Sequence, residues 1–481
     1  PIYGTLEKNF FLLDGSRSIM PDASEKIGYW SGEKSGVGCS FETAPTITIT
    51  FSEEHTSAGI TLYFSDDYPE SVSISWYTLA GEKIDAALFH PDRPVYFCKK
   101  QVQRYGKVEI VIEKMRFPDR YAKLQYILYG LHLSWEDDQI MSAKVHEEVD
   151  DTSDTLPINT AEIQISDEGY DFDIQNEEGT WKSVQRGQPV RLYEKVDEML
   201  IDVGSFFVES QKFSENTGTF SLVDTIGFMD LYTFRDGKIY VSEKAGIILE
   251  SIFAAAGVTL YDIDPEIYEI PLSGHLEIQS CRDALKAVCF ACGAVADDSR
   301  SGTVSIYKPN RLISGTVGPD RKISGKTSVE LDTYVSGVSI SSNVYTLSEE
   351  TSTLFDGELP VGSNMIELST PCAPETVTVD GGTIITAKTN YVEVFMAADG
   401  KCTVSGKSYE SNSYTVTKKV EKLESGEIEN VKEYSSVPLR GPDKVIRENL
   451  ESLLSFFQLR KLVSMEFFVE TEKVGNWILS L

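Results

Sequence analysis

The chain has 481 residues, 41% of them hydrophobic, a length that corresponds to about three or four domains. The 75 Asp and Glu outnumber the 44 Lys and Arg, and the net charge of −31 argues against a general nucleic-acid-binding protein, which neutralises phosphates with basic side chains. Seven irregularly spaced cysteines exclude a disulfide-rich secreted scaffold and favour reduced, cytosolic synthesis.

The N-terminus lacks the basic start and the apolar run of a signal peptide, because Phe10–Leu13 is followed at once by Asp14. The most apolar stretch, Ala245–Tyr261, contains Glu250 and is shorter than the ~20 residues that cross a bilayer. We therefore predict neither a signal peptide nor a membrane span.

Residues 1–133 carry strand patterns and no credible helix. Apolar and polar side chains alternate over Thr46–Phe51, Ile60–Phe64 and Val72–Trp76, and this period of two places each apolar set on one sheet face. Several short strands of this kind predict a jelly roll or β-sandwich. Further strands are expected at Val108–Ile112 and Leu124–Leu131.

The order of these segments, from Thr46–Phe51 through Gly59–Phe64 to Ser73–Tyr77, resembles the galactose-binding-like (discoidin-type) sandwiches. The resemblance implies a host-surface glycan as a partner of residues 1–133, with a purely docking role as the alternative. Trp76 is the candidate aromatic platform for a sugar, but its place in the strand alternation predicts that it packs in the core.

A local charge of +5 lies between Lys99 and Lys123, where eight basic residues accompany Glu109, Glu113 and Asp119. The interpretation we favour is a basic outer strand face that discourages edge-to-edge pairing. The alternative is a docking surface for an acidic partner. The basic residues are Lys99, Lys100, Arg104, Lys107, Lys114, Arg116, Arg120 and Lys123.

The charge distribution predicts a domain boundary near residue 134. Residues 1–133 hold 14 basic and 17 acidic side chains, a net −3, whereas residues 134–481 hold 30 and 58, a net −28. Between Trp135 and Asp154 eight acidic residues accompany the single base Lys144, and such runs are usually solvated. We predict an exposed connector here.

Residues 140–240 predict a second β domain, a small barrel. Asp171, Asp173 and Gln175 have the spacing of a calcium loop, but Asn176 stands where that loop requires glycine, so a β-hairpin is predicted instead of a calcium site. The expected strands are residues 161–166, 170–175, 189–195, 200–209 and 218–223.

Residues 241–310 predict a compact α+β domain. One helix is expected from an N-cap at Ser242 to Ala256, with Gly257 ending it. A second begins at the capping box of Ser280 and Asp283 and ends at Gly293. A strand pair is expected to follow, at residues 294–296 and 303–307.

Cys281, Cys289 and Cys292 lie on this second helix and suggest zinc at first sight. Structural zinc sites, however, combine two Cys-x-x-Cys pairs or one such pair with two His, and neither arrangement is present. We predict buried thiols on a helix face and no metal site.

Residues 311–481 are expected to form a further barrel domain with a β insertion near 360–430. Pro442 is predicted at the first helical position of an amphipathic helix whose apolar residues include Ile446, Leu450 and Phe457. A strand pair, 462–469 with 475–481, is expected to follow and to pair with strands from 325–345.

Three passages resemble the baseplate hub proteins of bacteriophage tails. The first is Val145–Asp150 with Thr155–Thr160, where members without an N-terminal sandwich begin, so residues 1–133 look like an added module. The others are Ser280–Leu285 continuing to Gly293–Asp297, and Phe456–Arg460 before Lys473–Trp477. Asn476 stands where aspartate is common in that family, and the chain ends soon after, so the resemblance implies that a longer protein continues beyond residue 481.

The resemblance implies tail-tube-like barrels in a homotrimeric ring that connects the tail tube to the tip or fibres. Its partners would be other tail proteins, and its location the virion tail. An acidic conduit would fit the passage of DNA, because it repels phosphates.

The hypothesis of an enzymatic function has less support. The five histidines, His55, His90, His132, His146 and His275, form no His-Glu-x-x-His motif, and no nucleophile elbow or phosphate-binding loop is present. We predict no catalytic, metal or cofactor-binding residues and no cofactor. A cell-surface carbohydrate-binding adhesin is the main alternative, and a glycosidase with paired carboxylates is a second.

Overall fold

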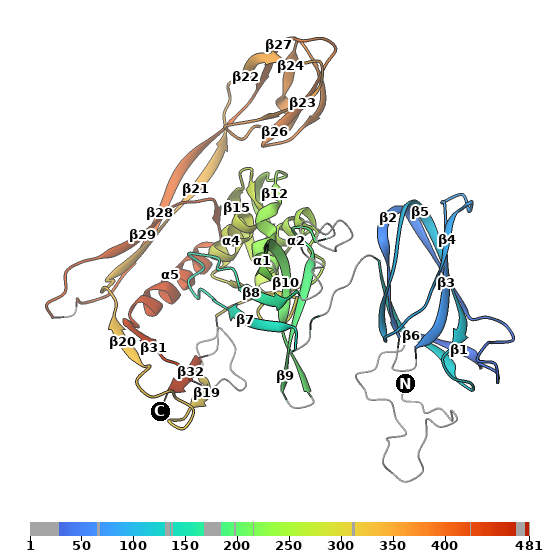
Figure 1. Cartoon of the computed structure of the whole chain (residues 1–481). Helices are drawn as coiled ribbons and strands as arrows, with labels where there is room; N and C mark the ends of the chain where they lie inside the picture. The colour runs from blue at the N-terminus through green and yellow to red at the C-terminus, as the bar shows by residue number, and fades with distance from the viewer. Residues whose placement is uncertain are drawn as a thin grey trace. The chain divides into compact units, whose positions relative to one another are not determined.

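A computed structural model confirms the predicted mainly β fold (Figure 1). It describes residues 28–64, 68–129, 135, 138–167, 184–196, 199–214, 216–309, 313–423, 425–467 and 477–480. The chain divides into two compact units, the first formed by Pro1–Asp138 with Thr180–Ser183 and the second by Gln139–Gly179 with Val184–Leu481. No described helix is long and apolar enough to span a membrane.

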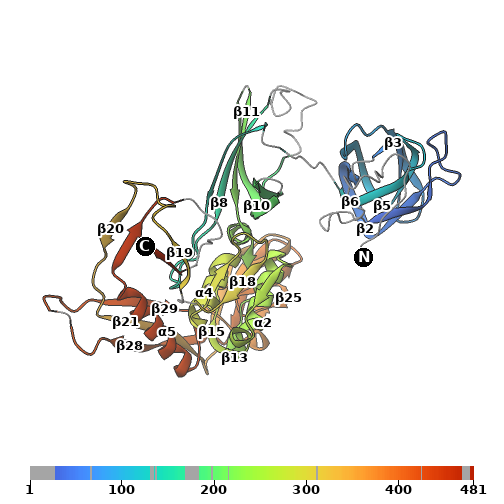
Figure 2. The same cartoon turned by 90° about the horizontal axis from the view of Figure 1, so that it is seen from below.

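The first unit is one six-stranded antiparallel sheet with the order β1-β6-β2-β5-β3-β4. Thr46–Phe51 and Ile60–Phe64, predicted separately, are parts of the single long strand β2, whose pairing with β5 shifts register near Gly59. Such bulges bend strands, and the sheet curls round on itself (Figure 2). The strands are β1 (Tyr29–Lys34), β2 (Thr46–Phe64), β3 (Pro69–Tyr77), β4 (Lys83–Phe89), β5 (Val95–Met115) and β6 (Tyr121–Tyr129).

The core of this unit lies on the concave face of the curled sheet. Val72, Ile74 and Trp76 are each 0% exposed and pack with Ile60 and Ile110. The predicted core position of Trp76 is therefore confirmed, and its ring offers no surface for a sugar.

The second unit begins with a curled five-stranded antiparallel sheet of order β7-β8-β11-β10-β9. Ala161, Ile163, Ile165, Phe220 and Leu222 alternate along β8 and β11 and are buried on one face. The strands are β7 (Ile140–His146), β8 (Thr160–Ser166), β9 (Pro189–Val196), β10 (Met199–Ser214) and β11 (Thr217–Val223).

An α+β part follows, in which α2 (Ala245–Ala256) and α4 (Cys281–Cys292) share one hydrophobic core. Its smaller elements are α1 (Thr225–Phe228), η2 (Met229–Leu231), β12 (Thr233–Phe234), β13 (Ile239–Lys244), β14 (Tyr261–Ile263), α3 (Pro265–Tyr268), β15 (Pro271–His275), β16 (Gln279–Ser280), β17 (Val295–Asp297) and β18 (Val304–Tyr307). The predicted strand pair is confirmed as β17 and β18, which run antiparallel.

The helix ends follow the predicted signals with one exception. Gly257 and Gly293 end α2 and α4 in the left-handed conformation, and Ser280 accepts a hydrogen bond from the amide of Asp283. The predicted cap at Ser242 is wrong: β13 pairs with β15 as far as Lys244, which keeps the chain extended, so α2 begins only at Ala245.

The C-terminal part is built on β21 (Gly337–Leu347), which lies between β28 (Tyr409–Lys419) and β29 (Val431–Val437). Helix α5 (Asp443–Phe457) buries Ile446, Leu450 and Leu453 in a core shared with β21. Pro442 immediately precedes the helix and is not its first residue, one position away from the prediction. The short strand β30 (Leu439–Arg440) pairs with β15.

Beyond the outer ends of β21 and β28, residues 352–406 form a separate lobe, which we call the distal lobe (Figure 1). It overlaps the predicted insertion at 360–430 and consists of two three-stranded sheets around its own core. Its elements are β22 (Ser352–Leu359), β23 (Gly362–Glu367), η3 (Pro374–Thr376), β24 (Thr378–Asp380), β25 (Thr383–Ala387), β26 (Tyr391–Met396) and β27 (Gly400–Gly406).

Two small sheets complete the described residues. β20 (Ser328–Leu331) pairs with β31 (Lys461–Ser464), as predicted for the 325–345 region. β19 (Ile313–Val317) pairs in parallel with β32 (Trp477–Ser480). Among the described residues the last two strands do not pair with each other, and β32 pairs with residues 313–317 rather than with the predicted region 325–345, so both of these predictions are wrong.

Candidate assembly surfaces and buried joints

The residues that could carry metal chemistry are not brought together. No cluster of three His, Cys, Asp or Glu suited to a metal occurs among the described residues. Cys281, Cys289 and Cys292 are free and buried, and burial raises the pKa of Cys281 to about 11 and of Cys292 to about 12. The predicted burial of these thiols on a helix face is confirmed, and buried thiols with raised pKa values react slowly. Asp171, Asp173 and Asn476, like His132, lie outside the described residues.

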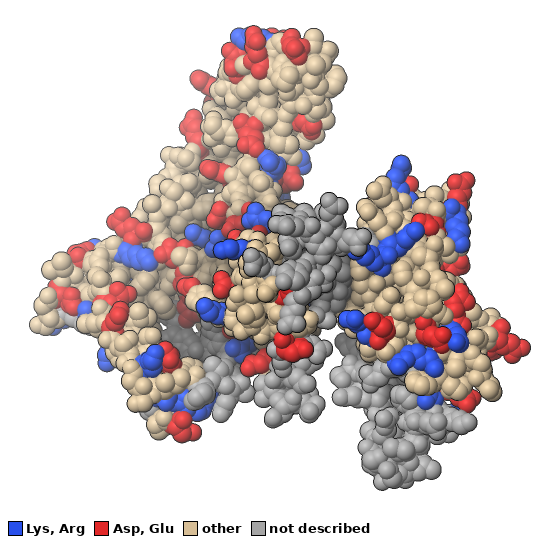
Figure 3. Space-filling model, viewed as in Figure 1, with Lys and Arg blue, Asp and Glu red and all other residues tan. Residues whose placement is uncertain are grey.

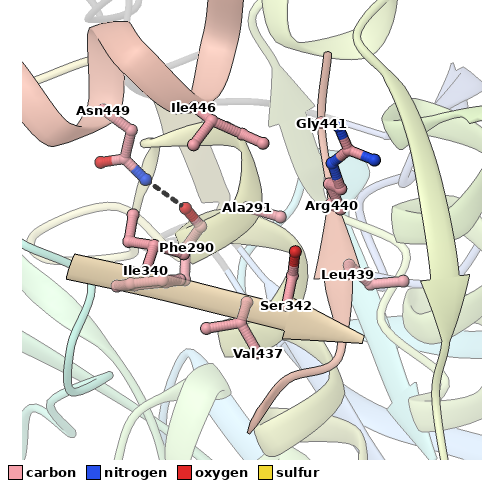
Figure 4. A pocket seen from close by; sticks show the side chains of 10 residues that line it. All are labelled: Phe290, Ala291, Ile340, Ser342, Val437, Leu439, Arg440, Gly441, Ile446 and Asn449. Atoms are coloured by element: carbon pink, nitrogen blue, oxygen red, sulfur yellow. Dashed lines mark hydrogen bonds between the residues drawn. The ribbon is translucent and has the colours of Figure 1, made fainter. Parts of the chain in front are cut away.

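A small cavity lies where α4, β21, β30 and α5 meet (Figure 4). Its volume is about 10 Å³, barely room for one water molecule, so it is too small for an organic ligand. On one side Asn449 Nδ2 donates a hydrogen bond of 2.8 Å to the carbonyl of Phe290. The cavity is a small gap in the packing between α4 and α5.

The basic stretch of the first unit is largely neutralised. Arg104 pairs with Glu54 at 2.7 Å and Lys114 with Glu70 at 2.8 Å. Arg116 lies 4.2 Å from the centre of the Tyr68 ring. Figure 3 shows basic and acidic side chains interspersed on the visible face of this unit. The predicted basic face that discourages edge-to-edge pairing is wrong, because β5 lies between β2 and β3 inside the sheet and Arg120 and Lys123 are buried. The exposed part of the stretch has mixed charge rather than a concentrated docking site for an acidic partner.

The strongest candidate surfaces are incomplete sheets in the second unit. β7 and β9 are the two edges of the curled five-stranded sheet and have no outer neighbour among the described strands. Met141 and Val145 on β7 and Tyr193 on β9 are exposed apolar or aromatic side chains. Sequence alternation alone does not indicate which strands are edges, so this surface could not be found from the pattern.

A second incomplete sheet is the pair β20–β31, which we call the ribbon. Val329 and Val463 lie directly opposite each other and are 62% and 47% exposed, while Leu331 and Leu462 are 68% and 64% exposed. An isolated two-stranded ribbon is marginally stable in water. Exposed edges with apolar side chains are templates for pairing with another chain.

A buried carboxyl pair joins the curled sheet to the α+β part. Asp224, which caps α1, and Asp298, in the turn after β17, are each 2% exposed. Asn159 contacts both carboxyls. Its backbone N–H donates a hydrogen bond of 2.7 Å to Asp224, and its side-chain Nδ2 donates one of 3.3 Å to Asp298. Burial, and then the neighbouring Asp298 charge, raise the pKa of Asp224 well above its ordinary value. Asp224 is therefore expected to retain its proton to a higher pH than an ordinary aspartate.

A second buried joint connects the distal lobe to the α+β part. His275, at the end of β15, is 1% exposed, and its Nε2 lies 2.6 Å from Oδ1 of Asn390 in the lobe. Asn390 Nδ2 in turn donates to the carbonyls of Leu276, at 2.9 Å, and Arg235, at 3.3 Å. Nothing in the spacing of residues 275 and 390 indicates this contact.

Comparison with known proteins adds a partial likeness. No protein-family model and no curated protein matches the chain. Among solved structures it is similar to a tail protein from Neisseria meningitidis MC58, with 13% identity and a TM-score of 0.28 over 39% of this chain and 55% of that one.

Two further solved structures show a likeness of the same extent. The 43 kDa tail protein of prophage MuSo2 from Shewanella oneidensis has 11% identity and a TM-score of 0.28, covering 42% of this chain and 64% of that one. The prophage tail protein gp18 from Listeria monocytogenes EGD-e has 12% identity and a TM-score of 0.27, covering 43% and 56%. The chain thus spans less than two thirds of each of these three tail proteins.

Proposed function

We propose that this chain is a structural component of a phage or phage-like tail, a baseplate hub that joins the tail tube to the tip or fibres. Its second unit would form a homotrimer around a central channel, and residues 1–133 would be an added module. The observation that carries the proposal is a pair of incomplete sheets: the five-stranded sheet, whose edges β7 and β9 have no outer neighbour among the described strands, and the ribbon, with apolar side chains exposed on both of its strands.

Leaving these sheets open costs free energy, because apolar side chains stay in contact with water. Val329, Leu331 and Leu462 expose apolar surface that a neighbouring subunit would bury, and each buried CH₂ contributes about 0.8 kcal/mol. An edge strand of one subunit that pairs with a different edge of the next makes a head-to-tail contact, and such contacts close into rings when the rotation permits. Three subunits is the number implied by the sequence resemblance.

Charge sets the conditions for this assembly. Each chain carries −31, so subunits repel one another, and salt screens this repulsion with a Debye length of ~8–10 Å at 0.1–0.15 M. Association driven by apolar and backbone contacts should therefore strengthen as salt is added. The same charge disfavours retention of DNA in the channel.

Substitution in the ribbon tests the proposal. Val463→Lys places a charge opposite Val329 without touching a buried core, and it should shift the monomer–trimer equilibrium toward monomer by at least tenfold in light scattering. Val241→Lys is the matched control, since Val241 is 80% exposed on β13 and outside the ribbon. Equal self-association of wild type and Val463→Lys would remove the ribbon from the interface.

The first unit is proposed to dock other tail proteins or a host-surface glycan. With Trp76 buried, the exposed aromatic side chains among the described residues of the first unit include Phe117 and, on β6, Tyr126 and Tyr129. Tyr126 stacks on Tyr63 with a centroid distance of 3.9 Å, and the pair is the candidate platform for a sugar beside Tyr129. A glycan array probed with the full chain separates the two roles. Glycan binding that is abolished by Tyr126→Ala and Tyr129→Ala supports a sugar site, and the absence of glycan binding supports docking to other tail proteins. The carbohydrate-binding adhesin alternative predicts glycan binding by a chain that stays monomeric.

A further inference from the structure

The distal lobe is held in two places. One is the stalk formed by β21 and β28, which pair from Gly337–Lys419 to Leu347–Tyr409. The third strand, β29, stops pairing at Ser342, so the outer part of the stalk is two-stranded. Among the described strands this outer part has no third neighbour, and its Tyr345 packs against His275. The second attachment is the joint at His275.

The joint is centred on one buried hydrogen bond. Because both hydrogens of Asn390 Nδ2 point to the carbonyls of Leu276 and Arg235, the amide orientation is fixed and Oδ1 faces the ring. His275 Nε2 must therefore donate to Oδ1, which leaves Nδ1 as the unprotonated nitrogen. Nδ1 is buried and has no hydrogen-bond partner among the described residues.

Protonation of His275 would place a proton on Nδ1, where a buried donor would have no acceptor. We propose that His275 and Asn390 form a pH-sensitive latch, which holds the distal lobe against the α+β part near neutral pH and releases it in acid. This inference concerns the joint itself and does not depend on a role in a tail.

The groups around the ring support this direction. Burial lowers the pKa of His275, and this effect outweighs the hydrogen bond to Asn390 and the charge of Glu277, both of which raise it. From β21, the Tyr345 ring packs edge-on with a centroid distance of 5.5 Å and is not an anion at these pH values. A lowered pKa means that the neutral ring stabilises the joint fully above about pH 6.5 and that this contribution is lost as the pH falls.

The remaining charged groups at the joint pair with each other. Arg235 forms an ion pair with Glu367 of the lobe, and Lys388 of the lobe lies 3.8 Å from Asp236. The Tyr391 hydroxyl also donates to Asp236, at 3.4 Å. These exposed contacts are weak individually. These contacts help to orient the distal lobe, whereas the buried hydrogen bond of His275 determines whether the lobe remains docked on the α+β part.

Hydrogen exchange on the full chain tests the latch. Between about pH 7.5 and pH 5, after correction for intrinsic rates, the amides of residues 388–391 and 275–276 should lose protection about tenfold, because a buried unpaired donor destabilises the docked state. The core strand β27 of the lobe should keep its protection, which separates release from unfolding. Unchanged protection at residues 388–391 in acid would overturn the proposal.

Three variants sharpen the test. His275→Gln keeps a donor for Asn390 but cannot be protonated, so its protection should not change with pH. Asn390→Ala removes the acceptor and should release the lobe at both pH values. His90→Gln is the matched control, because His90 is exposed in the first unit, belongs to neither the joint nor a proposed assembly edge, and should leave the wild-type profile intact. A pH response in His275→Gln equal to that of wild type would also overturn the latch.

Discussion

Asp224 and Asp298 face each other across the boundary between the curled sheet and the α+β part, both buried and both held by Asn159. The backbone amides of Gly227, at 2.7 Å, and Thr225, at 2.8 Å, complete their hydrogen bonds. Two carboxylates in such a site cannot both ionise without strong repulsion. A structural contact thus depends on a retained proton.

The first prediction concerns the proton that Asp224 retains in the folded state. The folded-state pKa of Asp224 lies above its unfolded value of 3.8, so the stabilisation is present below that value and is lost as the pH rises through the folded pKa. Asp298→Asn removes the like charge, and the free energy of unfolding should fall less steeply between about pH 4 and 8. Urea unfolding across this range measures the slope.

The control for this prediction is Asp262→Asn, because Asp262 is exposed on β14 and should leave the slope unchanged. An equally steep loss in Asp298→Asn and wild type would mean that the two carboxyls do not interact. Asp298→Asn should also be less stable at low pH, since the amide nitrogen cannot accept one of the existing hydrogen bonds.

The second prediction concerns the contact between α4 and α5. Asn449→Ala leaves the carbonyl of Phe290 without its partner in a buried site and should lower the free energy of unfolding by about 1–3 kcal/mol. Lys444→Ala, at an exposed position of the same helix, should change it by less than about 0.5 kcal/mol. Equal effects of the two substitutions would contradict the role given to Asn449.

The third prediction concerns Trp76. Trp76→Ala should cost about 3–5 kcal/mol, because the side chain is fully buried. Its Nε1 has no hydrogen-bond partner among the described residues, so Trp76→Phe loses no hydrogen bond and should cost clearly less. Thermal unfolding of both variants, with Leu79→Ala as an exposed control, provides the comparison. A loss for Trp76→Phe as large as that for Trp76→Ala would contradict the account in which Nε1 makes no hydrogen bond.

The fourth prediction concerns the cysteines. Cys39 is the least buried of the seven, whereas burial raises the pKa of Cys98 and Cys292 to about 12. In the native chain a disulfide reagent at neutral pH should therefore react with one thiol, and Cys39→Ser should abolish this reaction. Rapid reaction of a second thiol would contradict the burial of the other six.

Local patterns predicted the local structure well. The alternation around Trp76 and the capping signals at Ser280 and Gly293 act over a few residues, and the structure confirms them. The predicted helix cap at Ser242 is wrong because the pairing of β13 with β15, a tertiary interaction, overrides a local capping preference.

Features of the candidate surfaces depend on contacts between distant residues and could not be predicted. Which strands are edges is decided by the order of the whole sheet, and the contact of His275 with Asn390 joins segments 115 residues apart. No period or spacing in the sequence encodes either. The resemblance to hub proteins predicts an assembly. The surfaces through which subunits would associate, such as the ribbon with Val329 and Val463, can be recognised only in the three-dimensional structure.

Electron microscopy of the purified chain at tens of micromolar concentration and high salt tests the central proposal most directly. The proposal predicts particles with threefold symmetry, the number that the sequence resemblance implies, closed around a central channel by pairing of the edge strands β7 and β9 and of the ribbon. The fraction of such rings should rise with salt and fall in Val463→Lys. Particles that remain monomeric under these conditions, or that form a stable twofold dimer, would contradict the hub.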